Sequence, residues 1–304
     1  MANAYVANIP GNAVYVINVQ TNKVIGKLSV PLPFGIALSP NLKVVYVTSQ
    51  SSNRVWVFNA STRKLIRKIQ VGKSPQGIVV TPNGHRIWLA NSGDNTVSVI
   101  NAQTNKVIHT LPTGQTPSQL AVSPGGRFVY VSNSGSNSVS VFRTLTQRKI
   151  ATIPVGSAPG HIAFTPSGTR AYVLNTGSNS ISVIRTSTLR EISRFNVGSA
   201  GSRDPYGIAV STSGRNLFVT MFLDSLLSIS IPSNKIVRRI IFSDETTGSK
   251  APLGIAVRRN RIYMVASAND QVEVRAVPSL KVVATIQVPH TLESEQGLQE
   301  ITVG

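Results

Sequence analysis

Residues 75–111 read PQGIVVTPNGHRIWLANSGDNTVSVINAQTNKVIHTL. Four short runs rich in Val, Ile and aromatic residues alternate here with Pro, Gly, Asn and Ser, a pattern of strands and turns without a helical period. The runs lie at 77–80, 87–91, 96–101 and 106–111, and residues 81–86 form the first turn. The stretch therefore predicts a four-stranded antiparallel unit, whose strands are called A, B, C and D in chain order.

The unit recurs along the whole chain, and an aromatic residue in its B strand marks each copy. The spacings between successive markers are 41, 42, 42, 42, 46 and 45 residues. The markers are Tyr5, Tyr46, Trp88, Tyr130, Tyr172, Phe218 and Tyr263. Four strands in every 40 to 50 residues or so, repeated about four to eight times, are typical of a β-propeller. The sequence thus predicts an all-β, seven-bladed β-propeller with four antiparallel strands per blade, as a single domain over residues 1–304.

The two ends of the chain predict how the ring closes. The chain begins at a strand B, and residues 298–303 (LQEITV) align with the strand A at 75–80 (PQGIVV). The C-terminal strand is therefore expected to join the N-terminal blade. Such closure removes the open sheet edges that template aggregation, and it predicts a ring that is complete at its C-terminal end.

The composition is strongly basic, with 30 Lys and Arg against 11 Asp and Glu, a formal net charge of +19. Such a balance indicates a polyanionic partner, or it serves solubility alone. There is no cysteine, which excludes disulfides and thiolate chemistry, and no apolar run reaches the roughly 18 residues of a spanning helix. No signal peptide precedes the first strand, as in a secreted protein without its leader and equally in a cytoplasmic one.

The sequences around the marker aromatics resemble the YVTN-repeat β-propellers. The matching stretches are YVAN at 5–8, YVTS at 46–49, WLAN at 88–91, YVSN at 130–133 and YVLN at 172–175, with looser copies at 218–221 and 263–266. The resemblance implies a propeller in an extracytoplasmic location (periplasmic, secreted or at the cell surface), since the family includes archaeal surface-layer proteins and bacterial periplasmic proteins. At least one bacterial relative binds DNA. The family shares no catalytic motif, so the resemblance implies a shape rather than a reaction.

An antiparallel meander places the A–B and C–D turns on one face of the disc, here called the hairpin face. The B–C loops and the connections from strand D to the next strand A lie on the opposite, crossover face. The predicted polyanion-binding residues are all in hairpin-face turns: Lys43, Arg86, Arg127, Arg170, Arg215, Arg258, Arg259, Arg261, Lys64, Lys106 and Lys149. The only acid in these turns is Glu191. Nine acids are expected on the crossover face: Asp94, Asp204, Asp224, Asp244, Glu245, Asp270, Glu293, Glu295 and Glu300.

The basic turns depart from the resembled family in one direction. Its A–B turns usually read Ser-Pro-Asp-Gly-Lys, but the Asp position here holds Asn41, Asn83, Gly125, Ser167 and Ser213. Its C strands usually end in Asp, and here they end in Asn18, Asn59, Asn101, Arg143 and Arg185. Two interpretations stay open: a face that binds polyanions through counterion release, or turns that tolerate Lys and Arg and simply repeat. Few aromatics and no helix are present, so binding would follow charge and shape.

A second candidate site is the channel mouth on the crossover face, ringed by the residues just before each strand A. They are Phe34, Gln76, Gln119, His161, Tyr206, Leu253 and Gln299. Variation at one position of a regular repeat can build a ligand site, and a neutral solvent-lined position would vary in the same way. Glu300, in place of a small residue, and His161 are the candidate catalytic residues. They have no evident nucleophile partner and no converging zinc ligands, so we expect no metal and no cofactor.

Two repeated features are expected to be structural. The Asn residues that end strand B are expected to bond the B–C turn that follows them. These residues are Asn8, Asn91, Asn133 and Asn175. The marker aromatics are expected to pack between blades rather than to stack on a ligand.

Three functional hypotheses follow. The first is a non-catalytic extracytoplasmic binding or scaffold protein with a basic face for anionic polymers: nucleic acid, cell-wall polymer or acidic glycan. The second is an enzyme of the lactonase or lyase type at the crossover mouth, whose activity Glu300→Gln or His161→Ala would abolish. The third is a ring that docks a protein partner or packs into a surface array, recognisable by assembly that polyanions leave unchanged.

Overall fold

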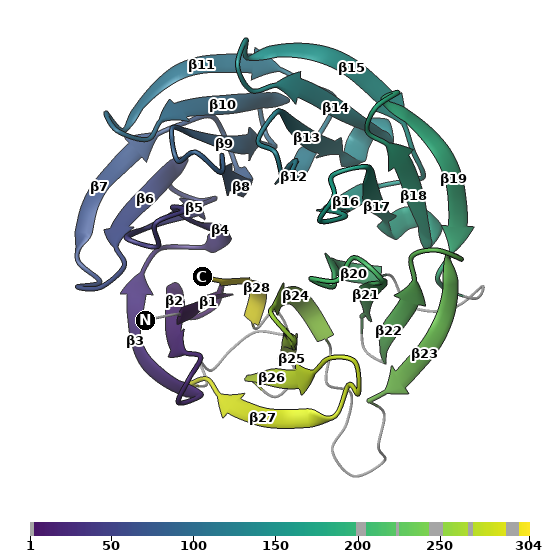
Figure 1. Cartoon of the computed structure of the whole chain (residues 1–304). Coiled ribbons are helices and arrows are strands. Elements are labelled where there is room, and N and C mark those ends of the chain that lie inside the picture. The colour runs from purple at the N-terminus through teal and green to yellow at the C-terminus, as the bar shows by residue number, and fades with distance from the viewer. Residues whose placement is uncertain (1–2, 199–204, 223–224, 243–251, 267–269, 290–297) are drawn as a thin grey trace.

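The computed structural model describes residues 3–198, 205–222, 225–242, 252–266, 270–289 and 298–304, with backbone alone for 298–300. These residues form seven four-stranded antiparallel sheets arranged in a ring (Figure 1), which confirms the predicted seven-bladed propeller. Apart from two three-residue 3-10 turns, η1 (Ser134–Ser136) and η2 (Thr176–Ser178), the regular structure of the described residues is all strand. No described helix is long and apolar enough to cross a membrane.

The blades are numbered I to VII, and their strands are given in the order A, B, C, D. Blade I holds β28 (Leu298–Val303), β1 (Asn3–Asn8), β2 (Ala13–Asn18) and β3 (Lys23–Ser29). Blade II holds β4 (Pro33–Leu38), β5 (Val44–Ser49), β6 (Arg54–Asn59) and β7 (Leu65–Gln70). Blade III holds β8 (Pro75–Val80), β9 (Arg86–Asn91), β10 (Thr96–Asn101) and β11 (Lys106–Pro112). Blade IV holds β12 (Pro117–Val122), β13 (Phe128–Asn133), β14 (Ser138–Arg143) and β15 (Arg148–Pro154).

The remaining three blades repeat the same order. Blade V holds β16 (Pro159–Phe164), β17 (Arg170–Asn175), β18 (Ser180–Arg185) and β19 (Arg190–Asn196). Blade VI holds β20 (Pro205–Val210), β21 (Asn216–Met221), β22 (Ser225–Ser230) and β23 (Lys235–Ile241). Blade VII holds β24 (Pro252–Arg258), β25 (Arg261–Ala266), β26 (Gln271–Ala276) and β27 (Val282–Gln287).

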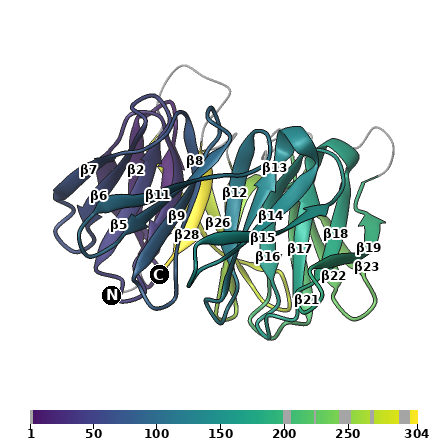
Figure 2. The same cartoon turned by 90° about the horizontal axis from the view of Figure 1, so that it is seen from above.

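The ring closes as predicted, because the last strand pairs with the first. β28 lies antiparallel to β1, with Ala4 opposite Val303 and Val6 opposite Ile301. The Gly304 N–H also donates to the Asn3 carbonyl at 3.0 Å. The two marked ends of the chain lie close together on the same face of the disc (Figure 2).

The hydrophobic core is divided into clusters that each join two neighbouring blades. Trp88 of blade III packs on Phe142 of blade IV with ring centroids 5.8 Å apart, and Tyr130 of blade IV meets Phe164 of blade V edge to face at 4.9 Å. Burial of each such side chain stabilises the fold by about 1.5–3 kcal/mol. The prediction that the marker aromatics pack between blades is therefore confirmed.

The outer rim is formed by the D strands, which run around the outside of the disc (Figures 1 and 2). Each is a sheet edge. In all of them but β27, which carries no cation, the side chains mix apolar residues, such as Ile66 (52% exposed) and Val237 (59% exposed), with Lys and Arg. The cations in the middle of these strands are Lys27, Arg67, Lys68, Arg194, Arg238 and Arg239. Charged side chains on an edge strand oppose sheet-to-sheet aggregation, so part of the net charge has a structural purpose.

Candidate functional site

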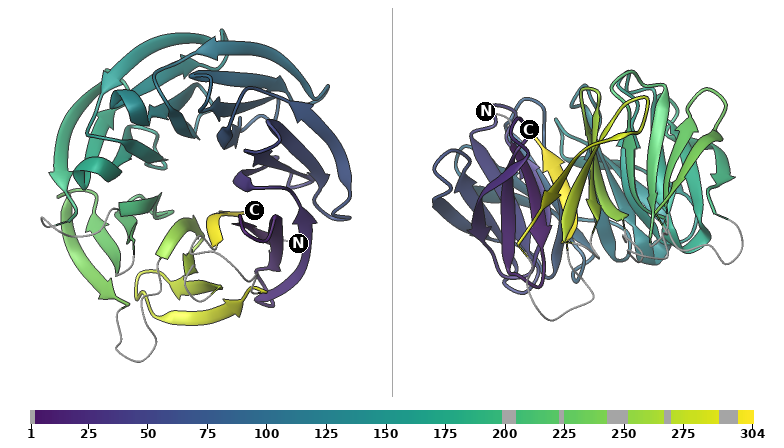
Figure 3. Two further views of the ribbon diagram at one scale, coloured as in Figure 1. Left: turned by 180° about the vertical axis from the view of Figure 1, so that it is seen from behind. Right: turned by 90° about the horizontal axis from the view of Figure 1, so that it is seen from below.

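The hairpin face is formed as the meander requires, and contacts between turns join it into one surface. Within blade IV the Thr144 hydroxyl donates to the Gly126 carbonyl at 2.7 Å, which links the C–D turn to the A–B turn. Between blades the Thr212 hydroxyl donates to the Arg259 carbonyl at 3.1 Å. The crossover face of the disc is seen in the left view of Figure 3.

The cations predicted for the hairpin face lie in its turns or at the strand ends beside them. Lys43, Lys64, Lys106, Arg127, Lys149, Arg215, Arg259 and Arg261 are exposed. Arg86, Arg170 and Arg258 are half-buried. Arg86 also donates through Nη1 to the His85 carbonyl at 3.0 Å, which fixes it to its own turn. The eight exposed side chains are the most accessible to a ligand, and Arg258, although half-buried, still lines a hollow of this face.

Neutral side chains shape these turns without adding negative charge. The Asn41 carbonyl oxygen accepts the Lys43 N–H at 3.1 Å, and the Asn83 carbonyl oxygen accepts the His85 N–H at 3.0 Å. An Asp at either position would make the same bond but would also offset the neighbouring cation. The turn geometry is thus kept while the face stays positive.

The ends of the C strands follow the same rule in three blades and depart from it in two. Asn18, Asn59 and Asn101 accept the N–H groups two and three residues further on, at 2.8–3.1 Å. Arg143 takes this position in blade IV, where its guanidinium lies 5.7 Å from the ring centroid of Phe128 and Arg127 lies 5.2 Å from it. Blade IV therefore holds two cations around one aromatic ring.

Acidic groups are scarce on this face. Glu191 pairs with Arg194 at 2.9 Å through two hydrogen bonds, so its charge is already matched. Of the acids expected on the crossover face, Asp94 and Asp270 are described, and both lie in B–C loops there. Asp94 accepts the Lys73 N–H at 2.7 Å. Outside the described residues lie Asp204, Asp224, Asp244, Glu245, Glu293 and Glu295, as does the side chain of Glu300.

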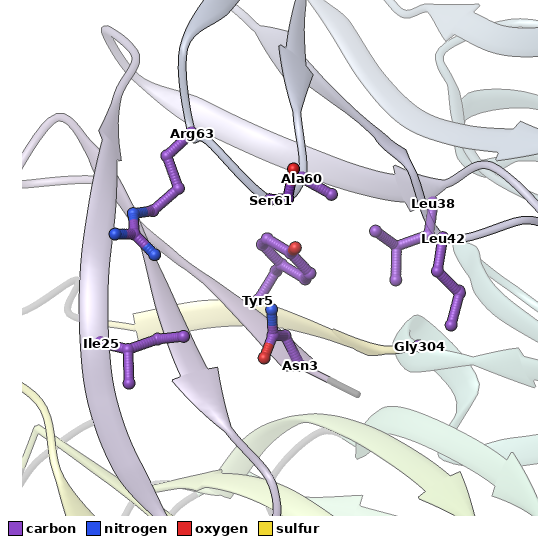
Figure 4. A pocket seen from close by; sticks show the side chains of 9 residues that line it. All are labelled: Asn3, Tyr5, Ile25, Leu38, Leu42, Ala60, Ser61, Arg63 and Gly304. Atoms are coloured by element: carbon purple, nitrogen blue, oxygen red, sulfur yellow. The ribbon is translucent and has the colours of Figure 1, made fainter. Parts of the chain in front are cut away.

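Three of the hollows lined by described residues open on the hairpin face; together they border blades VII, I and II, and one of them extends to blades III and IV. The largest, about 1100 Å³, is lined by residues of A–B and C–D turns, among them Lys43, Arg258, Arg259 and Arg261. A hollow of about 350 Å³ lies among the A strands and is lined mainly by apolar residues such as Ile36 and Val79. The third, about 340 Å³, lies between blades I and II (Figure 4).

The pocket in Figure 4 combines apolar walls with a cation. Leu38, Leu42 and Ile25 form much of its wall, and the Arg63 guanidinium and the Tyr5 ring face it. Arg63 crosses directly over Gly26, because a Cβ there would lie 2.8 Å from Arg63 Nε. Burial raises the pKa of Tyr5, while its hydrogen bond to Asn3 and the nearby Arg63 lower it.

The channel mouth of the crossover face differs from the single ring of equivalent side chains that we expected. Strand register aligns Pro75, Pro117 and Pro159 as the first residue of strand A. Gln76 is therefore the second residue of its strand A, whereas Gln119 and His161 are the third residues of theirs. Successive strand residues point to opposite sides of a sheet, so the two sets point differently. Phe34, Tyr206, Leu253 and Gln299 share the second position, and Glu300 shares the third.

The third residue of strand A faces the next blade, and in several blades there is no space for a side chain at this position. A Cβ on Gly35 or Gly207 would lie 2.5 or 2.7 Å from a carbonyl oxygen of the next strand A. His161 takes this place in blade V, and its ring lies 5.6 Å from the ring of Tyr206 in blade VI. Leu253 is buried at 3% exposure, while the side chains of Gln299 and Glu300 lie outside the described residues.

The Asn residues at the ends of the B strands are structural, but three of them have other partners than expected. Asn91 is fully buried. Its side-chain Oδ1 accepts the Gly72 N–H at 3.1 Å, and its Nδ2 donates to the Thr96 and Ser98 hydroxyls at 2.9 Å. Asn133 repeats this pattern, and Asn175 repeats the bonds to strand C. Asn91 and Asn133 thus tie the preceding crossover to strand C. Of the four, only Asn8 has a side-chain bond to its own B–C turn, accepting the Gly11 N–H at 2.8 Å.

Sequence reasoning missed a buried ion pair in blade VII. Glu273 and Arg275 lie two residues apart on β26 and form a salt bridge, with exposures of 2% and 6%. The Arg275 Nη1 also donates to the Leu280 carbonyl at 2.7 Å, and its guanidinium lies 5.1 Å from the Phe242 ring. A Glu-x-Arg spacing on a strand was the available signal, since such residues share a face.

Comparison with known proteins agrees with the fold. The family model described as "Lactonase, 7-bladed beta-propeller" matches residues 143–278, from the end of strand C in blade IV to the C–D turn of blade VII. No curated protein matches the sequence. Hydrazine synthase of Kuenenia stuttgartiensis is similar in structure, with a TM-score of 0.78 and 20% identity over 84% of this chain and 86% of that chain.

Two further solved structures are similar over nearly the whole of this chain. A functionally unknown protein from Desulfotomaculum acetoxidans has a TM-score of 0.80 and 17% identity, covering 99% of this chain and 98% of that one. The dihydro-heme d1 dehydrogenase NirN has a TM-score of 0.69 and 13% identity, covering 99% of this chain and 74% of that one. At these identities the likeness shows the shared propeller fold.

Proposed function

We propose that this seven-bladed propeller is a non-catalytic extracytoplasmic binding or scaffold protein whose hairpin face holds an anionic polymer. The observation that carries the proposal is the collection of exposed cations on one face, where the turns contain one described acid, Glu191, that is already paired. The resemblance to YVTN-repeat propellers, which include a DNA-binding member and surface-layer proteins, supports the same function and location.

The polymer is recognised through charge and shape. Each cation that neutralises an anionic group on a nucleic acid releases counterions and adds about 0.7–0.9 to the steepness with which log affinity falls with log salt concentration. Seven blades repeat the turns around a disc, so the cations form a ring rather than a single cluster. Such a ring suits a partner with regularly spaced charges, whether nucleic acid, cell-wall polymer or acidic glycan.

The test compares matched charge reversals on the two faces. Lys106→Glu with Arg215→Glu changes two exposed hairpin-face residues, and Arg54→Glu with Lys73→Glu changes two exposed crossover-face residues. The first pair is expected to weaken binding to single-stranded DNA and heparin more than about tenfold and to lower the salt slope by about two. The second pair should change either quantity little. Equal effects from both pairs would contradict the proposal.

A second candidate function is hydrolysis or lyase chemistry of the lactonase type at the crossover mouth. The match of residues 143–278 to the lactonase propeller model favours it, and this stretch contains the adjacent rings of His161 and Tyr206. Glu300 is the other candidate. Purified protein would be assayed against a panel of sugar lactones, with His161→Ala and Glu300→Gln as variants. Hydrolysis that both variants abolish supports this candidate, and absence of turnover on the panel counts against it.

A further inference from the structure

The A–B hairpin of blade VII is shorter than those of blades II to VI. In those five blades six residues separate the last pair of the A and B strands, for example Val80 and Ile87. In blade VII the pair Val257 and Ile262 is separated by the four residues 258–261 alone. Three of these four residues are arginines, whereas the longer turns mostly carry a single cation.

The short hairpin borders the hollow of about 1100 Å³, here called the arginine hollow. Its cationic lining consists of Arg258, Arg259 and Arg261 from blade VII and Lys43 from blade II. Gln20 of blade I and Asn41 of blade II also line it. Asn41 uses its carbonyl oxygen within its own turn, which leaves its amide N–H groups to face a ligand. The hollow thus gathers cations and hydrogen-bond donors from three blades.

The charge of this lining is unmatched. No acid belongs to it, and none of the four cations forms an ion pair within the part of the chain that the structure describes. Arg258 and Arg261 are moreover paired directly opposite each other, an arrangement in which like charges repel. An anion bound between them would be attracted to both guanidinium groups and would offset this repulsion.

Charge and size indicate the ligand class. Arginine's planar fork matches the oxygens of a phosphate in pairs, and a phosphate ester carries about −1.5 to −2 at neutral pH. Four cations therefore balance two phosphate groups rather than one. A hollow of about 1100 Å³ also exceeds what one ion needs and lies near the upper end of small-molecule sites, which span about 300–1,000 Å³.

We propose that the arginine hollow binds a compact ligand with two or more phosphate groups, and that it is the point at which the hairpin face holds a phosphate-rich polymer most tightly. The second clause rests on the proposed function, and the first stands without it. Arg258 and Arg261 grip one phosphate from both strands of the hairpin, and Arg259 and Lys43 take the next.

The test is calorimetric titration of the full chain with tripolyphosphate at about 150 mM salt, near physiological ionic strength. Arg259→Asn with Arg261→Gln removes two charges from the hollow, and Asn suits the left-handed backbone at Arg259 (φ 51°). Lys106→Gln with Lys149→Gln removes two exposed charges from the same face outside the hollow. Lys43→Gln removes the charge that blade II contributes to the hollow. Because this residue is outside the blade VII hairpin, the variant tests the hollow without changing that hairpin.

The hollow variants are expected to lose at least about tenfold in tripolyphosphate affinity, as when a charge-assisted hydrogen bond is removed, and the control pair less than about threefold. Inorganic sulfate at equal ionic strength should compete poorly. Equal losses in both pairs, or no binding by the unmodified chain, would overturn the proposal. If DNA and heparin bind but tripolyphosphate does not, the proposal for the arginine hollow is wrong and the proposal for a polymer-binding hairpin face is supported. If tripolyphosphate binds but neither polymer does, phosphate binding in the arginine hollow is supported and the proposal for a polymer-binding hairpin face is wrong.

Discussion

Arg258 and Arg261 lie directly opposite each other where the A and B strands of blade VII meet, with Arg259 and Asn260 as the only residues between them. Paired residues on neighbouring strands have Cβ atoms about 4.5–5.5 Å apart, so two cations there repel. No described acid pairs with either side chain. Blade VII therefore keeps two like charges opposite each other with no described acid to offset them.

Replacing Arg261 with Gln is expected to raise the thermal midpoint at low salt. Removing the repulsion should add about 0.2–1 kcal/mol of unfolding free energy, or about 0.3–1.6 °C for a chain of this size. Salt at about 0.5 M screens the charges and should remove most of the gain. Arg215→Gln, at a turn without a paired cation, is the control. A midpoint that falls at low salt would show that Arg261 stabilises the hairpin instead.

Tyr130 should make the protein sensitive to alkali. Its hydroxyl is buried without a hydrogen-bond partner among the described residues, and burial raises its pKa to about 12. The Tyr130 hydroxyl ionises near pH 10 in the unfolded chain but stays protonated in the folded chain up to about pH 12. The unfolding free energy should therefore fall as pH rises from about 10 to 12. In urea denaturation, Tyr130→Phe should be as stable as the unmodified chain or slightly more so at pH 7, and it should lose less stability at about pH 11.5. An unchanged pH dependence would contradict this.

Asn91 should be among the polar residues that matter most for stability. Replacement with Ala removes its hydrogen bonds to Gly72, Thr96 and Ser98 in a fully buried place. The loss should be about 2–3 kcal/mol, because partners are left unsatisfied as well. Asn83→Ala, in an exposed turn, should cost under about 1 kcal/mol by the same denaturant measurement. Polyanion affinity should stay the same in both variants, and a selective loss in Asn91→Ala would indicate a binding role.

The rim cations should protect against aggregation. Arg67→Val on β7 leaves an edge strand whose exposed side chains Leu65 and Ile66 are already apolar. Light scattering should then rise with protein concentration at a given salt, because uncharged edges pair with one another. Thr62→Val, an exposed change in the neighbouring C–D turn, is the control. Scattering equal to that of the unmodified chain would show that other features protect the edge.

The fold was predictable because its information is repeated. Each copy places an aromatic in strand B and turn residues at similar offsets, so even a single unit such as 75–111 specifies four strands. The bounds of β8 to β11 match that prediction to within two residues. The closing strand was predictable too, since residues 298–303 keep the pattern of strand A.

The sites were less predictable, because they depend on where the repeat breaks. Gln76, Gln119 and His161 are predicted from the sequence to share one position just before strand A. The recurring Pro sets the strand register instead, and it shifts Gln119 and His161 by one residue relative to Gln76. The arginine hollow depends on a hairpin two residues shorter and on neighbours two blades away, which no local pattern encodes. The rim cations lie within D strands, so the division of turns between two faces does not reveal them.

A polyanion-binding hairpin face is tested most directly by a salt titration of the unmodified protein with a labelled single-stranded oligonucleotide and with heparin. We expect binding to both, with log affinity falling linearly against log salt at a slope that indicates several contacts of about 0.7 each on the oligonucleotide. Absence of binding to either polymer at low salt would contradict such a face and would turn attention to the channel mouth around His161.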